Sequence, residues 1–333
     1  MKSQPDPHNE RGVILIALLW ILVALSVVAL SFSREGFVEV AAARNARDLT
    51  RSYYVARAGI AATVYELWKK RTRPPVRGIE LAEEPNPIDL GKLSGRLGDG
   101  YYDVEIQDES GKINLNFVQE EHLRSLLAVL EIPKPEADII TDSIQDWRDL
   151  DNLHRINGAE DDYYQSLETP YKAKNGQFDT VEELLQVRGI TADYFYGHEE
   201  AGPDGAPRYR YGLSRYLTVY SPPSGRVNIN HAPLVVLLSI PGMPPEAAQF
   251  IYERRLAKPV RDLGGIMKEL PVQLGANVMP LLSTGETGFY MLTSFGRLEN
   301  SKVRRVVRTV ISLDMRDASR YMILYWNENV PNL

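Results

Sequence analysis

The hydrophobic pattern of the chain begins with an uninterrupted apolar run. Residues 13–32 contain no charge, and they stand between Arg11-Gly12 and the charged pair Arg34-Glu35. At about 1.5 Å per residue, such a run spans roughly 30 Å as a helix, the thickness of a bilayer's hydrocarbon core. The pattern therefore predicts one membrane-spanning helix. Because the flanking charge bias is weakly positive on the N-terminal side, we expect the large C-terminal part outside the cytoplasm.

Beyond the apolar run the pattern becomes amphipathic. Apolar residues such as Phe37, Val40, Ile60 and Val64 recur at steps of three and four among arginines and glutamates. This spacing is typical of a helix with one buried face. The first strong breaker is Arg73-Pro74-Pro75, so we predict a single helix over residues 13–71.

The remaining pattern predicts a mixed α+β chain. Residues 114–287 contain several short helical runs and are expected to be mainly helical. The segments on both sides alternate β-branched or aromatic residues with polar ones, as strands do. The expected strands are 101–107, 288–298, 303–313 and 321–326, and the last three are expected to form an antiparallel meander. Because strands flank the helical stretch, we expect an α/β domain, residues 72–113 and 288–333, into which a helical domain is inserted.

Two similar segments, which we call the echo segments, divide the expected inserted domain into two units. Ser110 to Asn116 reads SGKINLN, and Ser224 to Asn230 reads SGRVNIN. We interpret each as a turn, a short strand and an asparagine that caps the helix after it. Similar sequence follows both, so two related units of one strand and two helices are predicted.

Composition narrows the possible functions. The 333 residues carry a net charge of −6 and no cysteine, which excludes disulfides and cysteine-ligated zinc. Residues 118–200 hold 19 Asp and Glu against 7 Lys and Arg. Such a surface would repel phosphates, so no nucleic-acid partner is expected.

The acidic stretch contains a candidate metal loop. Asp146, Asp149 and Asp151 are followed by Glu160 and Asp161 beyond a glycine. These carboxylates would repel one another unless a cation lies between them, and calcium accepts six to eight oxygen ligands. The spacing is not that of an EF-hand. A solvated acidic loop or a set of helix caps remains the alternative.

Together these motifs resemble a known family. The Arg-Gly junction before an apolar helix, the paired SGKINLN and SGRVNIN segments, and the run DWRDLD followed by GAEDDYY are similar to the K-type minor pseudopilins (GspK) of type II secretion systems. The resemblance implies a pilin-like fold: a long N-terminal helix, transmembrane then amphipathic, an antiparallel sheet, and a large inserted α-domain over residues 114–287.

The resemblance also implies a maturation route. Residues 1–12 would be a leader that prepilin peptidase removes by cutting between Gly12 and Val13, and the new N-terminus at Val13 would be methylated. Ala17 stands where most pilins carry a glutamate that pairs with a neighbouring subunit's N-terminus, which suits a subunit that need not dock beneath another. Chance replacement at an apolar position is the alternative.

Location, partners and cofactor follow from the same resemblance. The protein would cross the bacterial inner membrane once, with its C-terminal domain in the periplasm, at the tip of the pseudopilus. It would initiate or cap assembly and contribute to export of folded proteins across the outer membrane. Its partners would be other minor pseudopilins, the major pseudopilin and possible secretin or substrate contacts. Calcium on Asp146, Asp149, Asp151, Glu160 and Asp161 would be structural.

Other classes of function stay open. A minor type IV pilin would share the leader and helix, and a plain signal anchor would share only the apolar run. Two helix-hairpin-helix-like segments, 184–190 and 238–242, are typical of membrane-anchored DNA receptors, although the first lies in acidic surroundings. No catalytic motif is recognisable among the five histidines or the glycine-rich segments, so an enzyme is not expected.

Overall fold

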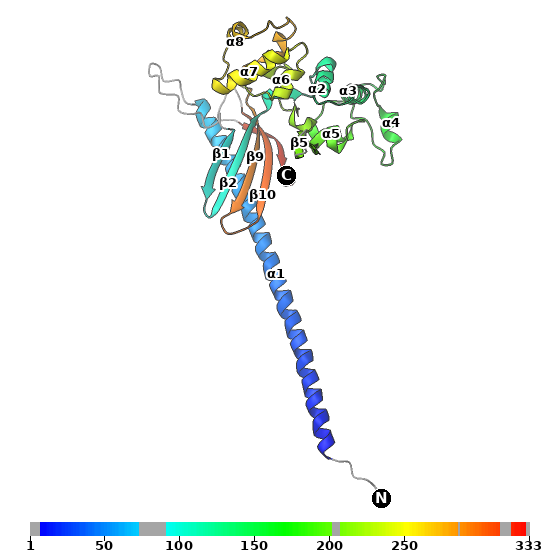
Figure 1. The fold of residues 1–333 in the computed structure, drawn as a ribbon, viewed down its shortest axis with the longest axis vertical. Coiled ribbons are helices and arrows are strands. Elements are labelled where there is room, and N and C mark those ends of the chain that lie inside the picture. The colour runs from blue at the N-terminus through cyan, green and yellow to red at the C-terminus, as the bar shows by residue number, and fades with distance from the viewer. Residues whose placement is uncertain (1–6, 73–90, 202–206, 286, 314–320, 331–333) are drawn as a thin grey trace, which may run out of the picture.

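A single long helix dominates the molecule. The computed structural model describes residues 7–72, 91–201, 207–285, 287–313 and 321–330, and in it α1 runs unbroken over Pro7–Thr72 (Figure 1). Within the described residues it is the one helix long and apolar enough to cross a membrane. Its side chains from Ile14 to Phe32 are exposed along their length, as a lipid-facing segment requires. The predicted continuous helix is confirmed.

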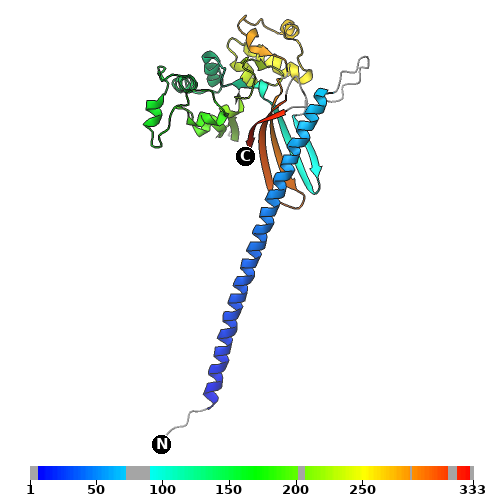
Figure 2. The same ribbon diagram turned by 180° about the vertical axis from the view of Figure 1, so that it is seen from behind.

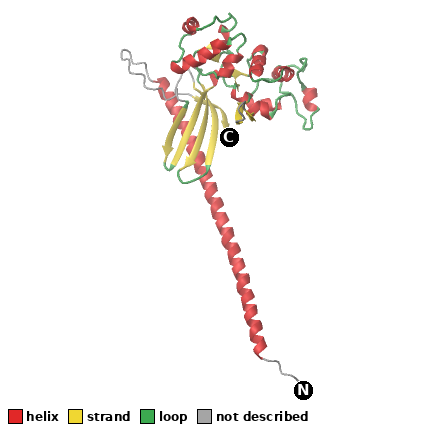
Figure 3. Ribbon diagram, viewed as in Figure 1, coloured by secondary structure: helices red, strands yellow, loops and turns green. Residues whose placement is uncertain are grey.

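The upper part of α1 lies against a five-stranded antiparallel sheet with strand order β1-β2-β9-β10-β11. Figure 2 shows the sheet from behind, and Figure 3 separates its strands from the helices. The strand bounds are β1 Lys92–Leu97, β2 Gly100–Asp108, β9 Phe289–Leu298, β10 Arg304–Leu313 and β11 Tyr321–Asn327. The predicted meander of the last three strands is confirmed, whereas β1 was not predicted.

Small residues let α1 approach the sheet closely. A Cβ added to Gly296 in β9 would overlap the α1 backbone at Ser52 and Ala56. Next to it, the Ser294 hydroxyl donates a 2.7 Å hydrogen bond to the Ala56 carbonyl. Around this contact Ile60 and other apolar residues of α1 form one buried cluster with the inner faces of β2, β9 and β10.

The helical domain is inserted between β2 and β9. The chain leaves the sheet at Asp108 and returns at Phe289, which agrees with the predicted α+β fold with a large helical insertion. Its α-helices are α2 Glu120–Val129, α3 Lys134–Arg148, α4 Asp161–Gln165, α5 Ala192–Tyr196, α6 Leu234–Ser239, α7 Pro245–Ala257 and α8 Leu263–Glu269. The described residues of the domain also form four 3-10 helices, namely η1 Glu109–Gly111, η2 Val181–Gln186, η3 Leu213–Arg215 and η4 Met279–Leu281. The domain has its own hydrophobic core, separate from the cluster under α1.

Each of the two echo segments contributes one strand to a short parallel strand pair. The strands are β3 Ile113–Asn114, β4 Gly197–Ala201, β5 Pro207–Tyr211, β6 Leu217–Thr218, β7 Val227–Asn228 and β8 Leu282–Ser283. β3 pairs in parallel with β6, and β7 pairs in parallel with β8, so each echo segment begins one such pair. The antiparallel hairpin of β4 and β5 was not predicted.

The echo asparagines do not cap helices, contrary to our interpretation. Asn116 exchanges two hydrogen bonds with the backbone of Phe178, at 2.9 and 2.7 Å. Asn230 does the same with Val260, at 2.8 Å each. The helices that follow begin three or more residues later, after Gln119 and Pro233, so these side chains cannot reach their first amides. They tie distant loops to each unit instead.

Candidate metal centre

The candidate metal centre lies in the loop between α3 and α4. α3 is held by its apolar face, because Ile140, Ile144 and Trp147 are buried in the core of the inserted domain. Trp147 packs edge-on against Tyr164 of α4, with ring centroids 5.2 Å apart. The contact between Trp147 and Tyr164 holds the two ends of the loop close together. The acidic residues of the loop therefore lie near the C-terminal end of α3.

Three of the predicted carboxylates converge there. Asp149, Asp151 and Glu160 each offer a carboxylate oxygen, and these oxygens lie within 4.8 Å of one another. The residues are half-buried, exposed and buried in that order. The site is thus anchored on the protein side and open toward solvent, as an ion that exchanges with solution requires.

The buried side of the cluster lacks protein partners. Both carboxylate oxygens of Glu160 and Oδ1 of Asp149 are buried with no hydrogen-bond partner. Desolvation, followed by the nearby charges of Asp146 and Asp149, raises the pKa of Glu160 to about 7. Desolvation and then the charge of Asp151 also raise the pKa of Asp149. Buried carboxylates of this kind are stabilised either by taking up a proton or by a cation that compensates for lost water.

The other two predicted ligands lie in the helices on either side of the loop, Asp146 in α3 and Asp161 in α4. Asp146 is fully buried, and the backbone amide of Arg155 donates to its carboxylate at 3.2 Å, while the Arg155 Nε lies 3.4 Å away. Asp161, at the start of α4, accepts a 2.8 Å hydrogen bond from the amide of Ala173. These two carboxylates position the loop in this structure, whereas Asp149, Asp151 and Glu160 form the cluster. Asp162 instead pairs with His154, at 2.7 Å.

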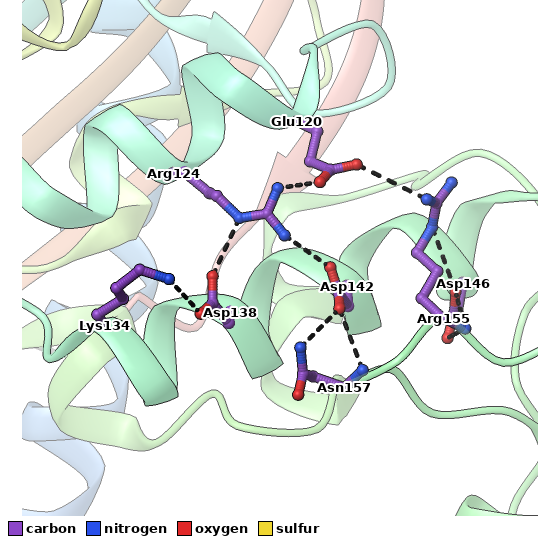
Figure 4. A network of polar contacts seen from close by, with 8 residues as sticks. All are labelled: Glu120, Arg124, Lys134, Asp138, Asp142, Asp146, Arg155 and Asn157. Carbon is purple, nitrogen blue, oxygen red and sulfur yellow. Dashed lines mark hydrogen bonds and ion pairs between the residues drawn. The ribbon is translucent and has the colours of Figure 1, made fainter.

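A polar network fixes the loop to α2 and α3 (Figure 4). The Arg124 side chain reaches from α2 to Glu120, Asp138 and Asp142. Asp142 in turn accepts hydrogen bonds from the backbone and side-chain amides of Asn157, at 3.1 and 3.0 Å.

The same loop depends on a glycine at its turn. A Cβ at Gly158 would overlap the Asp146 carboxylate. The roles of Asp142, Arg155 and Asn157 were not predicted, because only the folded loop brings Arg155 and Asn157 back to the carboxylates of α3.

A second loop, which contains Asn175, packs against the acidic loop near Asp151. Asn175 adopts a left-handed backbone conformation with φ of 48°. From there its side-chain amide donates 2.9 Å hydrogen bonds to the Asp151 carbonyl and to Asn152. Asparagine tolerates this conformation better than most residues.

The donor set suits a hard divalent cation. Its atoms are carboxylate oxygens with no nitrogen or sulfur among them, which matches calcium better than zinc. Asp149, Asp151 and Glu160 would hold the ion, which would neutralise their charges and fix the loop.

The predicted processing positions lie in α1. Gly12 and Val13 belong to its first turns, and only their backbone is described. Ala17 is exposed one turn later, within the apolar segment. The predicted cleavage and methylation therefore remain predictions.

The chain is similar in sequence to known proteins of type II secretion systems. The family model described as "Type II secretion system (T2SS), protein K" matches residues 105–196, the segment that contains the metal loop. A type II secretion system protein K from Aeromonas hydrophila is 28% identical over 213 residues, which cover 56% of this chain and 61% of that protein. The protein K of Pseudomonas aeruginosa is 24% identical over 335 residues, covering 90% and 93%.

A solved structure shares the fold. A chain in the crystal structure of the GspK-GspI-GspJ complex from enterotoxigenic Escherichia coli aligns with a TM-score of 0.61 at 17% identity, covering 86% of this chain and 99% of that one. The resemblance inferred from the sequence motifs is confirmed.

Proposed function

We propose that this chain is a type II secretion system protein K. Its role would be that of the minor pseudopilin at the tip of the secretion pseudopilus. The observation that carries this proposal is the combination of one membrane-length helix with a pilin-like sheet and a large helical insertion in that sheet. A free soluble binding protein would have no need of the exposed apolar half of α1.

The shape of the molecule supports the tip position. The inserted domain and the sheet gather around one end of α1, and the bare apolar helix extends from the other (Figure 1). A subunit stacked directly above would have to clear the inserted domain, whereas subunits below would not. Capping the filament and contributing to export of folded proteins follow from that position.

Partners and location form part of the proposal. The structural neighbour is a complex with GspI and GspJ, and we propose that this chain binds the corresponding minor pseudopilins, with the major pseudopilin below them. The apolar helix would be anchored in the bacterial inner membrane, and the folded part would lie in the periplasm. Secretin or an exported protein would meet the exposed end.

Maturation tests the pilin pathway directly. We expect prepilin peptidase to cut between Gly12 and Val13 and Val13 to be methylated. The experiment is intact mass and N-terminal sequencing of the membrane protein, with and without the co-expressed peptidase. A peptidase-dependent chain that starts at Val13 and is one methyl group heavier supports the proposal. A chain that starts at Met1 in both samples contradicts it.

Calcium would act as a structural cofactor. The unpartnered buried oxygens of Glu160 and Asp149 support this, because a bound ion would compensate for their lost hydration. Asp151 would complete the set with its exposed carboxylate. Titration of the purified chain with calcium, followed by calorimetry, tests this part separately from maturation.

A further inference from the structure

The metal loop carries a run of exposed residues with large apolar side chains among them. Residues 150–156 are all exposed, and three of them, Leu150, Leu153 and Ile156, are large and apolar. Leu150 is 86% exposed and Ile156 is 99% exposed, more than any other large apolar side chain of the described residues, those of the membrane-length segment included. We call residues 150–156 the loop ridge. Single exposed apolar residues are ordinary on a protein surface, whereas a group of them in one short loop indicates an interaction site.

The first half of the loop ridge is held beside the carboxylate cluster. Leu150 stands between Asp149 and Asp151, two members of that cluster. The amide of Leu153 donates a 2.9 Å hydrogen bond to the Asp151 carboxylate. The side-chain amide of Asn175 donates to the Asp151 carbonyl, also at 2.9 Å. The backbone that carries Leu150 and Leu153 is thus fixed, although both side chains are exposed.

The second half of the loop ridge is held by α3. Ile156 stands between Arg155 and Asn157, whose backbone amides both donate to carboxylates of that helix. The Arg155 amide donates to Asp146 at 3.2 Å, and the Asn157 amide donates to Asp142 at 3.1 Å. A surface that is ordered before it binds loses little conformational entropy on binding. The loop ridge is therefore better suited to docking than a loop without such hydrogen bonds.

Acidic residues surround the loop ridge. Residues 118–200 hold 19 Asp and Glu against 7 Lys and Arg, an excess larger than one divalent ion would cancel. The arginine within the ridge does not offset this excess, because Arg155 lies 3.4 Å from Asp146 and 3.7 Å from Glu120. Asp162 contacts the ridge at His154, 2.7 Å away, and its side chain is 73% exposed. A partner at the loop ridge would therefore meet apolar side chains in an acidic setting.

These charges decide among the possible occupants. A second copy of the chain would bring a second acidic surface, and like charges facing each other across an interface are unfavourable. A membrane surface that contains anionic phospholipids would be repelled for the same reason. In addition, α4, where the metal loop ends, lies at the opposite end of the molecule from the apolar segment of α1 (Figure 1). Neither a second copy nor the anchoring membrane fits the loop ridge.

A basic protein surface with an apolar pocket fits both properties of the loop ridge. The aliphatic side chains would be buried in the pocket, and lysines and arginines at its rim would face the acidic surroundings. We infer that the loop ridge docks into a partner protein that presents such a pocket. This inference rests on the proposed function, and it names the surface through which the exposed end of the molecule makes contact.

Photo-cross-linking from the loop ridge tests the inference. In cells with the complete secretion system, Ile156 of the full chain is replaced by p-benzoylphenylalanine, and Leu256 is replaced in a matched control. Leu256 is 72% exposed and lies near the end of α7, outside the metal loop. We expect one partner protein to be cross-linked from position 156, with a yield at least tenfold above that from position 256.

Two changes within the loop ridge test whether its apolar side chains carry the contact. Leu150→Ser and Leu153→Ser are combined in the chain that has the photoreactive residue at position 156. We expect the cross-linking yield to fall at least tenfold. Both parent side chains are exposed, so this variant should melt as the parent does. If it melts lower, the salt dependence of binding decides.

Salt dependence tests the charge of the partner. The cross-linked protein is identified by mass spectrometry, purified, and bound to the parent chain in detergent. Because salt screens exposed charges, the dissociation constant should rise at least threefold between about 0.05 M and about 0.5 M salt. A dissociation constant that stays the same or falls overturns the basic rim, and the inference with it.

The outcomes separate this inference from the proposed function. If the parent chain does not restore export in cells that lack it, the proposed function fails. If export is restored while positions 156 and 256 cross-link equally, the ridge inference alone is overturned. Cross-links only to phospholipid, or only to a second copy of the chain, overturn it as well. So does a yield that Leu150→Ser and Leu153→Ser leave unchanged.

Discussion

At the residue scale, Glu160 decides how the metal loop responds to pH. Its folded-state pKa, raised from 4.5 to about 7, means that the folded chain holds a proton that the unfolded chain has lost between these values. Without calcium, this residue's contribution is most favourable below about pH 4.5 and is lost as pH rises through 7. We expect the melting temperature in chelator, measured relative to Glu160→Gln, to fall between pH 5 and pH 8.

Calcium should reverse that trend, because it binds the deprotonated carboxylates. At a calcium concentration 100 times the dissociation constant, binding adds about 2.7 kcal/mol to stability. Thermal melts at pH 8 should show this gain in the parent chain and lose it when Asp149→Ala and Asp151→Ala are combined. Asp162→Ala is the control, since Asp162 pairs with His154 outside the cluster. Equal melting in calcium and in chelator would refute the metal assignment.

Two asparagines provide a second test at the same scale. Asn116 and Asn230 each satisfy both backbone groups of a distant residue, so their removal leaves a partly buried amide and carbonyl unpaired. We expect Asn116→Ala and Asn230→Ala each to lower the free energy of unfolding by about 1–3 kcal/mol in urea denaturation. The exposed Asn300→Ala should change it by less than about 0.5 kcal/mol.

At the scale of elements, the sequence predicts those helices and strands that have a regular hydrophobic pattern. The helix α1 and the strands β9 and β10 follow their hydrophobic patterns, because each buries one face, whereas β11 forms where its alternation predicts it although its residues are exposed or half-buried. β1 escaped prediction because its glycine and its alternate exposed residues give no clear face. The five predicted ligands show the same limit. Composition could identify an acidic loop, but only the packing of α3 against α4 separates Asp149, Asp151 and Glu160 from Asp146 and Asp161.

The contact between α1 and β9 gives a prediction for these elements. A side chain at Gly296 cannot fit without pushing α1 away from the sheet. We expect Gly296→Val to destabilise the α1–sheet core by about 1–3 kcal/mol or more, measured by chemical denaturation in detergent. Gly285→Ala is the control, because a Cβ there meets no atom within 4 Å. Similar losses from both variants would show that the close approach of helix and sheet is unimportant.

At the scale of the whole molecule, two hydrophobic cores divide the stability. One lies within the inserted domain, and the other lies between α1 and the sheet. The metal loop belongs to the first core and Gly296 to the second, so each perturbation should act on one core. We expect differential scanning calorimetry of the full chain to show two transitions. Chelation should lower only one of them and Gly296→Val only the other.

The assignment of the two transitions has an independent check. Trp147 lies in the inserted domain beside the metal loop, whereas Trp326 lies beside α1 in the sheet. With Trp20 and Trp68 replaced by phenylalanine, fluorescence of the Trp147→Phe and Trp326→Phe variants should each follow one transition. A single transition that moves as a unit under both perturbations would mean that the inserted domain and the pilin-like sheet unfold together. Calcium would then stabilise the sheet as well as the loop.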